Sequence, residues 1–400
     1  MKGNTGVSLS IMMFLEYFIW GSWYVTLGSY MPEYLKSSSN QIGSAYSALA
    51  WATIVSPFFV GLVADRFFSA QRIMGVLHLV GAVLLFIAPT ITDNTLFYFV
   101  VLAYSLAYMP TIALSNNVAF HQMSDPGKQF PWIRVFGTVG WIAAGVLISY
   151  IGMEKSPNTF IMAAAASALL GLFSFFLPDT PPPQKNAPAS ASKALGLEAL
   201  VLFKSRAYLI FFIAAVLVCI PLSFYYELAN RFLNDLGMDN TAAKMTMGQV
   251  SEAVFILAIP FLFRRIGVKN MLLFGMTAWI LRYVCFAYGD IGSGAWMLYA
   301  GILLHGICYD FFFVTGYMYT EMKAGQRIKN AAQGLFTFAT YGLGMVIGTK
   351  IAGSVAENYA ISDTAHNWEK IWMVPVYIAL GVLVYFLLFF REKRNIESTK

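Results

Sequence analysis

The chain has 400 residues, of which 58% are hydrophobic and only 12% are charged, and its formal net charge is +6. A soluble globular protein carries about 25% charged residues, so this chain has too few charges to cover a surface exposed to water. The deficit extends over the whole length, which predicts an integral membrane protein rather than a soluble domain with one anchor. The N-terminus leads straight into an apolar segment without a small-residue cleavage site, and we predict a first helix rather than a removable signal.

Twelve apolar segments follow one another along the chain, each close to the ~20 residues that a membrane-spanning helix needs. The connections are short except for 178–206, which begins with a tract rich in proline, alanine and serine that cannot pack a core. We therefore predict an all-α membrane protein with an N-terminal six-helix bundle (1–178), a cytoplasmic linker (179–206) and a C-terminal six-helix bundle (207–400). Within the linker, 195–203 fits an amphipathic helix on the membrane surface. The predicted spans are 8–32, 41–64, 73–91, 95–120, 130–151, 158–177, 207–233, 244–263, 269–288, 295–320, 328–354 and 369–390.

The distribution of lysine and arginine sets the expected orientation. With both termini in the cytoplasm, eighteen of the 26 basic residues lie on the cytoplasmic side, six lie on the opposite side, and Arg134 and Arg282 lie within spans. The positive net charge is thus explained by membrane topology, and it does not predict nucleic-acid binding. The three cysteines lie in apolar runs and indicate no disulfide framework.

Charged residues within the predicted spans are the first functional signal. Arg134 lies near the start of the fifth span, in the stretch FPWIRVFGTVGW. A guanidinium keeps its charge, and placing it among lipid tails costs at least ~3 kcal/mol. It must therefore face protein or a watery cavity, beside an anionic or polar partner. Glu16, Glu252 and Asp310 pose the same problem, and we predict that these four groups converge on one polar cavity through which a small molecule is carried.

The two halves of the chain have similar basic turns. GLVADRFFSAQR (61–72) follows the second span, and PFLFRRIGVKN (260–270) follows the eighth. The first turn resembles the G-x-x-x-D-R signature of the major facilitator superfamily, with Gly61, Asp65, Arg66 and Arg72 in place. Six plus six spans with matching turns predict that fold: two six-helix bundles around a central cavity. In such folds the site lies near the middle of the membrane between the bundles, and access alternates as one half rocks against the other.

Longer stretches carry a closer resemblance. They are WGSWYVTLGSYM (20–31), IGSAYSALA (42–50), SLAYMPTIAL (105–114), IRVFGTVGW (133–141), QVSEAVFILAIPF (249–261), AWILRYVCFAYGD (278–290) and YDFFFVTG (309–316). In order and spacing, from about residue 8 to 390, they resemble the nucleoside:proton symporter family of the major facilitator superfamily, and most of all its bacterial nucleoside permeases.

The resemblance implies a nucleoside-binding site built from several spans. The family has amide side chains on the seventh span where this chain has Ser223 and Tyr226, so the resemblance does not fix the substrate preference. The implied residues are Arg134, Thr138 and Trp141 on the fifth span, Ser223 and Tyr226 on the seventh, Gln249 and Glu252 on the eighth, and His305, Tyr309 and Asp310 on the tenth.

The spacing of these residues gives them a physical role. Arg134, Thr138 and Trp141 stand at i, i+4 and i+7 and share one helix face, which offers a cation, a hydroxyl and an aromatic ring to a ring-bearing polyol. Gln249 and Glu252 stand at i and i+3, and their amide and carboxylate suit ribose hydroxyls or a base edge. The alternatives are that Arg134 only pairs with an acid to hold the halves together, and that Glu252 is a protonated acid bonded to a neighbouring helix.

The remaining buried charges leave several roles open. Asp310 can accept a hydrogen bond from a ribose hydroxyl, carry the coupled proton, or form a salt bridge with Arg134 or Arg282. Tyr309 points to a different side in an unbroken helix, although flanking glycines would allow local unwinding. Arg282 itself is interpreted as a structural tie.

Glu16 and the histidines His78 and His305 complete the set, and His305 is expected to line the cavity. Glu16 either pairs with Arg134 or adds a third proton-coupling site to Glu252 and Asp310. His78 has no metal-ligand partner at useful spacing, and we interpret it as a packing residue.

The sequence contains no Walker-type phosphate loop, no nucleophile–base arrangement and no zinc-ligand cluster, which argues against ATP-driven transport and against an enzyme. We predict a monomeric symporter without cofactor, embedded in the bilayer of a bacterial inner membrane with both termini cytoplasmic. Its substrates would be a nucleoside and protons, and it would import the nucleoside by alternating access. A proton-coupled sugar or drug transporter of the same fold and a transport-inactive, ligand-sensing receptor remain open as alternatives.

Overall fold

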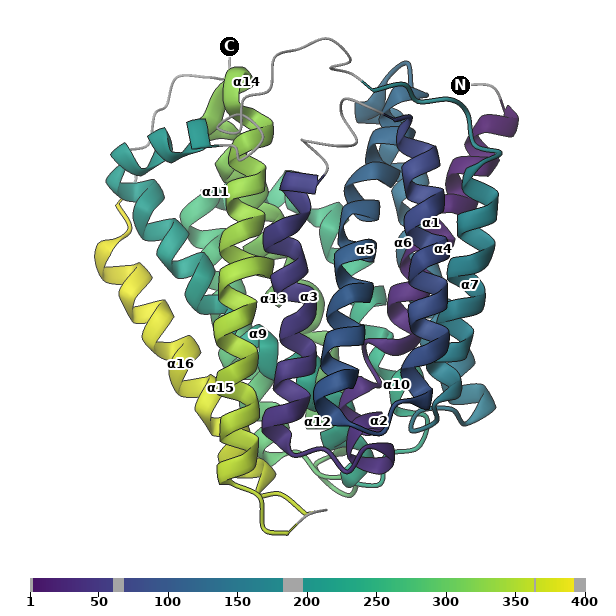
Figure 1. Cartoon of the computed structure of the whole chain (residues 1–400). Helices are drawn as coiled ribbons and strands as arrows, with labels where there is room; N and C mark the ends of the chain where they lie inside the picture. The colour runs from purple at the N-terminus through teal and green to yellow at the C-terminus, as the bar shows by residue number, and fades with distance from the viewer. Residues whose placement is uncertain (1–2, 60–67, 183–196, 363–364, 392–400) are drawn as a thin grey trace.

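The computed structural model describes residues 3–59, 68–182, 197–362 and 365–391, and these are almost entirely helical (Figure 1). The described part of each of the twelve predicted spans is mainly helical, so the predicted all-α class is confirmed. In the first half the helices are α1 (Gly3–Trp23), α2 (Leu27–Tyr34), α3 (Ser39–Phe59), α4 (Ala70–Ile87), α5 (Asn94–His121), α6 (Pro126–Ile151) and α7 (Asn158–Ser174). In the second half they are α9 (Arg206–Asp235), α10 (Thr241–Met245), α11 (Met247–Tyr288), α12 (Ala295–Leu303), α13 (His305–Tyr309), α14 (Thr315–Thr337), α15 (Met345–Asn358) and α16 (Trp368–Phe389).

Two of the predicted turns are made at glycines inside long helical stretches. Gly267 in α11 has φ 74° and Gly325 in α14 has φ 63°, a backbone conformation that residues with a side chain avoid. α11 therefore contains most of the eighth span and all of the ninth. α14 contains the end of the tenth span and the beginning of the eleventh.

Two sequence features lie partly outside the described residues. The loop signature predicted at 61–72 lies mostly outside them, since 60–67 are not described. In the linker, 183–196 also lie outside, and the predicted amphipathic helix at 195–203 corresponds to a 3-10 helix, Leu197–Lys204.

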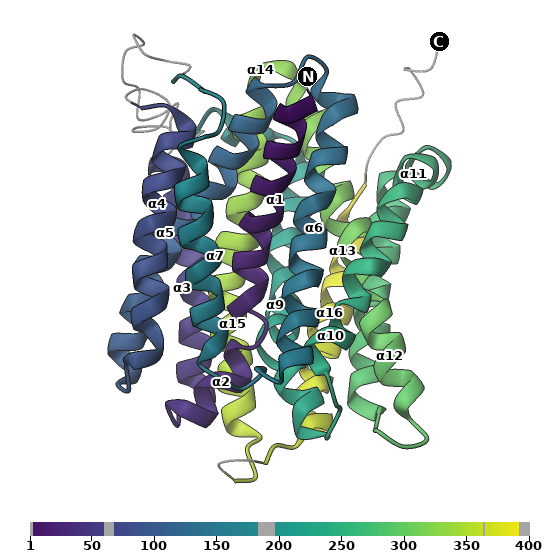
Figure 2. The same ribbon diagram turned by 90° about the vertical axis from the view of Figure 1, so that its right-hand side faces the viewer.

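Buried apolar side chains form two large clusters. One takes residues from Leu9 to Leu177, and the other takes residues from Ala199 to Phe390 together with Ala50. Figure 2 shows the corresponding halves, with α4, α7, α1 and α6 on one side and α11, α12 and α16 on the other. In the described part of the chain, nine helical stretches are long and apolar enough to cross a membrane, and α1, α3 and α7 occupy the other predicted spans.

Polar contacts between the two bundles gather at one end, opposite the end where α1 begins (Figures 1 and 2). There α2, α3 and α6 meet α9, α10 and α15. We name this contact the closed end. Among the described residues, all hydrogen bonds recorded between the bundles lie there: Ser29 to Asn230 (2.7 Å) and Asn234 (3.2 Å), Ser39 to Arg231 (3.3 Å), Asn40 to Ser354 (3.0 Å) and Glu357 (3.3 Å), Ser149 to Ala243 (2.8 Å), and Glu154 to Ala242 (2.8 Å).

Glycines set the distance between α1 and α6. A Cβ added at Gly140 would lie 2.1 Å from the Phe14 carbonyl oxygen, and one added at Gly137 would lie 2.6 Å from the Tyr17 ring. At Gly140 the two helices touch through their backbones, and at Gly137 the Tyr17 ring packs directly on the α6 backbone. This close approach brings α1 side chains directly against Arg134.

We expect Gly140→Val to push α1 away from α6 and to destabilise the protein by ~1–3 kcal/mol, because an overpacked contact cannot relax without moving backbone. The matched control is Gly381→Val in α16, where an added Cβ would meet nothing within 4 Å. Thermal unfolding in detergent, followed by tryptophan fluorescence, should show a lower midpoint for the first variant only. Equal midpoints would contradict the role assigned to Gly140.

Candidate functional site

The predicted face of α6 lies against α1 and the space between the bundles. The Arg134 guanidinium stands 4.0 Å from the centre of the Tyr17 ring, close enough for a cation–π interaction. Arg134 and Thr138 are half-buried. Trp141 packs edge-on against Trp20 with ring centres 5.5 Å apart. Its ring is therefore held in a fixed orientation.

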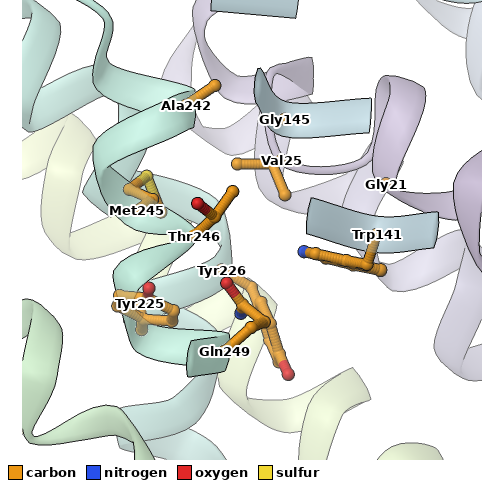
Figure 3. Close-up of a pocket in the computed structure, with 10 residues that line it drawn as sticks. All are labelled: Gly21, Val25, Trp141, Gly145, Tyr225, Tyr226, Ala242, Met245, Thr246 and Gln249. Carbon is orange, nitrogen blue, oxygen red and sulfur yellow. The ribbon is translucent and has the colours of Figure 1, made fainter. Parts of the chain in front are cut away.

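A pocket lies between the bundles and adjoins the closed end. Trp141 from one bundle and Tyr226 and Gln249 from the other face it (Figure 3). Two aromatic rings and an amide can hold a flat ring system and bond its polar edge. The pocket is lined by Gly21, Val25, Trp141, Gly145, Tyr225, Tyr226, Ala242, Met245, Thr246 and Gln249.

Glu252, one turn further along α11 than Gln249, is the electrostatic centre of the site. Its carboxylate interacts with the charge of Arg134 across the bundle interface and with the Asp310 carboxylate within its own bundle. His305 Nε2 lies 3.9 Å from its Oε2 atom. One carboxylate thus links α6, α11 and α13.

Arg282 fixes the tautomer of His305. A guanidinium only donates, so its Nη1, 3.0 Å from His305 Nδ1, makes that nitrogen an acceptor and leaves the proton of the neutral ring on Nε2, toward Glu252. The Arg282 charge also lies 3.4 Å from the centre of the Tyr225 ring. The result is a line of groups from Arg282 through His305 to Glu252, and the interpretation of Arg282 as a mere tie is incomplete.

Close packing at glycines and a change in helix type determine the positions of the residues next to Arg282, His305 and Glu252. A Cβ at Gly306 would lie 2.6 Å from the Ser251 backbone, and one at Gly248 would lie 3.1 Å from His305 Cβ, so α13 and α11 pack closely here. Asp310 begins a π-helical segment, Asp310–Val314, and π segments occur often at functional sites. The local change in winding agrees with the predicted unwinding around Tyr309.

Asp310 and Tyr309 differ in their surroundings. Asp310 is 0% exposed, and neither carboxylate oxygen has a hydrogen-bond partner among the described residues. The predicted alternative of a salt bridge to Arg134 or Arg282 is therefore wrong for this conformation. Tyr309 is half-buried and its hydroxyl bonds the hydroxyl of Tyr341, which lies in a second π segment, Phe338–Gly344.

Glu16 does not pair with Arg134, and that alternative is wrong. Its carboxylate bonds His78 Nε2 at 3.0 Å and the Thr111 hydroxyl at 2.6 Å, inside the N-terminal bundle. The second nitrogen of His78 lies 3.3 Å from the Ser167 hydroxyl. His78 is thus a packing residue with both nitrogens satisfied. Two local partners, which the linear sequence does not place beside Glu16, outcompete the distant cation.

Of the predicted site residues, Trp141, Tyr226 and Gln249 line the pocket, and Ser223 is among those that do not. It is fully buried, its hydroxyl donates to the Cys219 carbonyl at 2.9 Å, and it packs against Gly348 of α15. A serine side chain inside a helix often turns back to its own backbone in this way. Its neighbour Tyr226, three residues on, reaches the pocket.

Sequence reasoning missed Glu227, a buried acid within the predicted span 207–233. The rule that selected Glu16, Glu252 and Asp310 applies to it equally, so the signal was present. It also missed Tyr17, whose role depends on the α1–α6 contact. In the described ranges, no group of three or more His, Cys, Asp or Glu residues could hold a metal ion.

Comparison with known proteins gives these features a common explanation. Residues 3–395 match the family described as Nucleoside H+ symporter. The chain is 40% identical to the transporter YegT of Escherichia coli (strain K12), over 98% of this chain and 95% of that protein. It is 37% identical to a xanthosine permease of the same organism, over 99% and 98% of the two chains. A crystal structure of the nucleoside transporter NupG superposes with a TM-score of 0.90 at 34% identity, covering 98% of this chain and 100% of that one.

The predictions of a major facilitator fold and of a transporter rather than an enzyme are confirmed. The chain is a multi-pass membrane protein that belongs to the nucleoside H+ symporter family.

Proposed function

We propose that this chain imports nucleosides together with protons across a bacterial inner membrane, with both termini in the cytoplasm. The observation that carries the proposal is the pocket between the bundles, lined by Trp141 from one bundle and Gln249 from the other. Glu252, one turn beyond Gln249, interacts with the charge of Arg134 of the opposite bundle. The excess of basic residues on the side of the termini supports the orientation. The closed end would then face the periplasm, and the structure would represent a state open to the cytoplasm.

The nucleoside would contact side chains from both bundles. Trp141 and Tyr226 would pack against the base, and Gln249 and Glu252 would hydrogen-bond its polar edge or the ribose hydroxyls. Arg134 and Thr138 would lie deeper along the same α6 face. Because the ligand would bridge the bundles, it would favour conformations in which they approach each other, which is what alternating access requires.

The coupled proton would be carried by the pair Glu252 and Asp310. The Glu252 carboxylate is largely buried, but it interacts with the charge of Arg134, and His305 Nε2 lies 3.9 Å from it. Asp310 has no hydrogen-bond partner among the described residues, and burying an unpaired carboxylate is costly. Two interacting carboxylates titrate as one unit, so Asp310 would hold the proton here and lose it when the surroundings of Glu252 change.

His305 and Tyr309 would border the site and hold these groups in place. A monomer is sufficient for this arrangement, because one chain supplies both sides of the pocket. The proposed units are the two bundles, 1–178 and 207–400, with 179–206 as the linker, and the two apolar clusters support that division.

We expect Trp141→Ala to weaken nucleoside binding by about 5- to 150-fold, since stacking of a base on an aromatic ring contributes ~1–3 kcal/mol. Trp141→Phe should retain most of the affinity. The control is Trp132→Ala in the same helix, whose side chain is 76% exposed and faces away from the pocket. Titration calorimetry with uridine and adenosine measures the effect, and unchanged affinity in Trp141→Ala would remove that residue from the site.

We expect Asp310→Asn to abolish uptake driven by an inward proton gradient while exchange of labelled for unlabelled nucleoside continues. The amide keeps the shape of the neutral acid but cannot release a proton. Proteoliposomes loaded with nucleoside separate the two activities, and Asp290→Asn, at a backbone-capping acid outside the site, is the control. Gradient-driven accumulation by Asp310→Asn would contradict the proton role, and absence of gradient-stimulated nucleoside uptake by the unmodified protein would contradict the proposed function.

A further inference from the structure

Glu227 is a buried acid that the proposed transport mechanism does not use. It lies on α9, beside the pocket residue Tyr226, and is 1% exposed. Neither of its carboxylate oxygens has a hydrogen-bond partner among the described residues. Isolated carboxylates are rarely left this way in proteins, and the position therefore requires an explanation.

The carboxyl group lies within the closed end, in a space made by glycines of both bundles. A Cβ added at Gly43 of α3 would lie 3.2 Å from Glu227 Oε1, and one added at Gly353 of α15 would lie 3.3 Å from the same atom. A Cβ at Gly28 of α2 would lie 2.4 Å from the Glu227 backbone carbonyl. Closing the bundles therefore encloses this carboxyl group, and separating α3 from α15 would admit water to it.

Among the described residues, none of the charged and titratable groups that face Glu227 hydrogen-bonds its carboxyl group. Arg231, one turn further along α9, acts on the carboxylate, but its Nη1 atom donates to Ser39 of α3 at 3.3 Å. Tyr46 of α3 donates its hydroxyl proton to the Tyr24 carbonyl of α1 at 2.9 Å. On α15, the Glu357 carboxylate accepts from the Asn40 backbone at 3.3 Å and faces Arg231.

An ionised carboxylate in this space would lose its hydration without gaining donors, whereas the neutral acid loses much less. We propose that Glu227 is a second proton-binding site, distinct from Glu252 and Asp310, and that the closed end forms over its neutral carboxylic acid. The proton would come from water while the two bundles are apart at this end, convert the carboxylate to the acid, and return to water when they separate again. The inference uses the alternating access of the proposed function, but it does not depend on the identity of the substrate.

Proton binding and closure must then promote each other equally. When the open state binds fewer protons than the closed state, the ratio of closed to open molecules falls with rising pH, by up to about tenfold per pH unit for one proton. At low pH the closed arrangement predominates. The ratio of closed to open molecules falls as pH rises because closure removes water from the ionised Glu227 carboxylate.

The test measures this ratio without nucleoside, so that its outcome is independent of the transport assay. Spin labels at Thr92→Cys and Asn358→Cys, both exposed at the closed end on opposite bundles, report its width by pulsed electron resonance in a Cys285→Ser background. Between pH 5 and 9 we expect a short distance to give way to a longer one. Glu227→Gln, which keeps the neutral shape, should remain at the short distance throughout, and Glu227→Met serves if the amide variant does not fold.

Glu33→Gln is the matched control, because this acid lies on α2 at the same end but its side chain is exposed. It should retain the pH dependence. The proposal is overturned if the distances do not change with pH, if Glu227→Gln and Glu227→Met both retain the full change, or if Asp310→Asn alone abolishes it. Failure of gradient-driven uptake with an intact pH-dependent distance would instead contradict the proposed function and leave the Glu227 site supported.

Discussion

The structure depends on compensation for the Arg282 charge in the C-terminal bundle. This guanidinium is fully buried, cannot lose its proton, and has no carboxylate in direct contact among the described residues. Its contacts are instead the Tyr225 ring, whose centre lies 3.4 Å from the guanidinium carbon, and His305 Nδ1, 3.0 Å from its Nη1 atom. The other nitrogen of His305 lies 3.9 Å from the Glu252 carboxylate. His305 of α13 thus stands between the buried cation and the carboxylate of α11, and a change at either group changes the surroundings of the imidazole.

Close helix contacts determine where the charged groups can act. Gly137 and Gly140 let α1 approach α6, which places Tyr17 over Arg134. Gly306 does the same for α13 and α11, beside Glu252. In lipid no hydrophobic force draws helices together, so small residues that permit backbone contact provide much of the packing. The small residues that let the helices of each bundle pack closely therefore also set the geometry of the site.

The sequence supported the fold and part of the site for a physical reason. Long apolar segments have few alternatives to spanning helices, so the spans could be predicted. Arg134 could be singled out because a charge within a span needs a polar partner. Trp141 and Gln249 were implied by the family resemblance, and spacing along one helix showed which side chains share a face with them. Partners on different helices follow no such rule: the bond of Glu16 to His78, the position of Ser223 against α15 and the role of Arg282 depend on packing between distant segments. Glu227 was missed although its charge within a span was visible.

The buried acids Glu16, Glu252 and Glu227 differ in which donors or cations lie near each carboxyl group, and this difference separates the roles that they can have. Glu16 has two donors and lies within one bundle, so its surroundings need not change as the bundles move. Glu252 has neighbours in both bundles, because Arg134 and His305 belong to different halves. Glu227 lies in the contact itself. A group is sensitive to alternating access only if the movement changes its hydration or its partners. In the proposed mechanism Glu252 would therefore respond to what occupies the space between the bundles, whereas Glu227 would respond to whether one end of that space is closed.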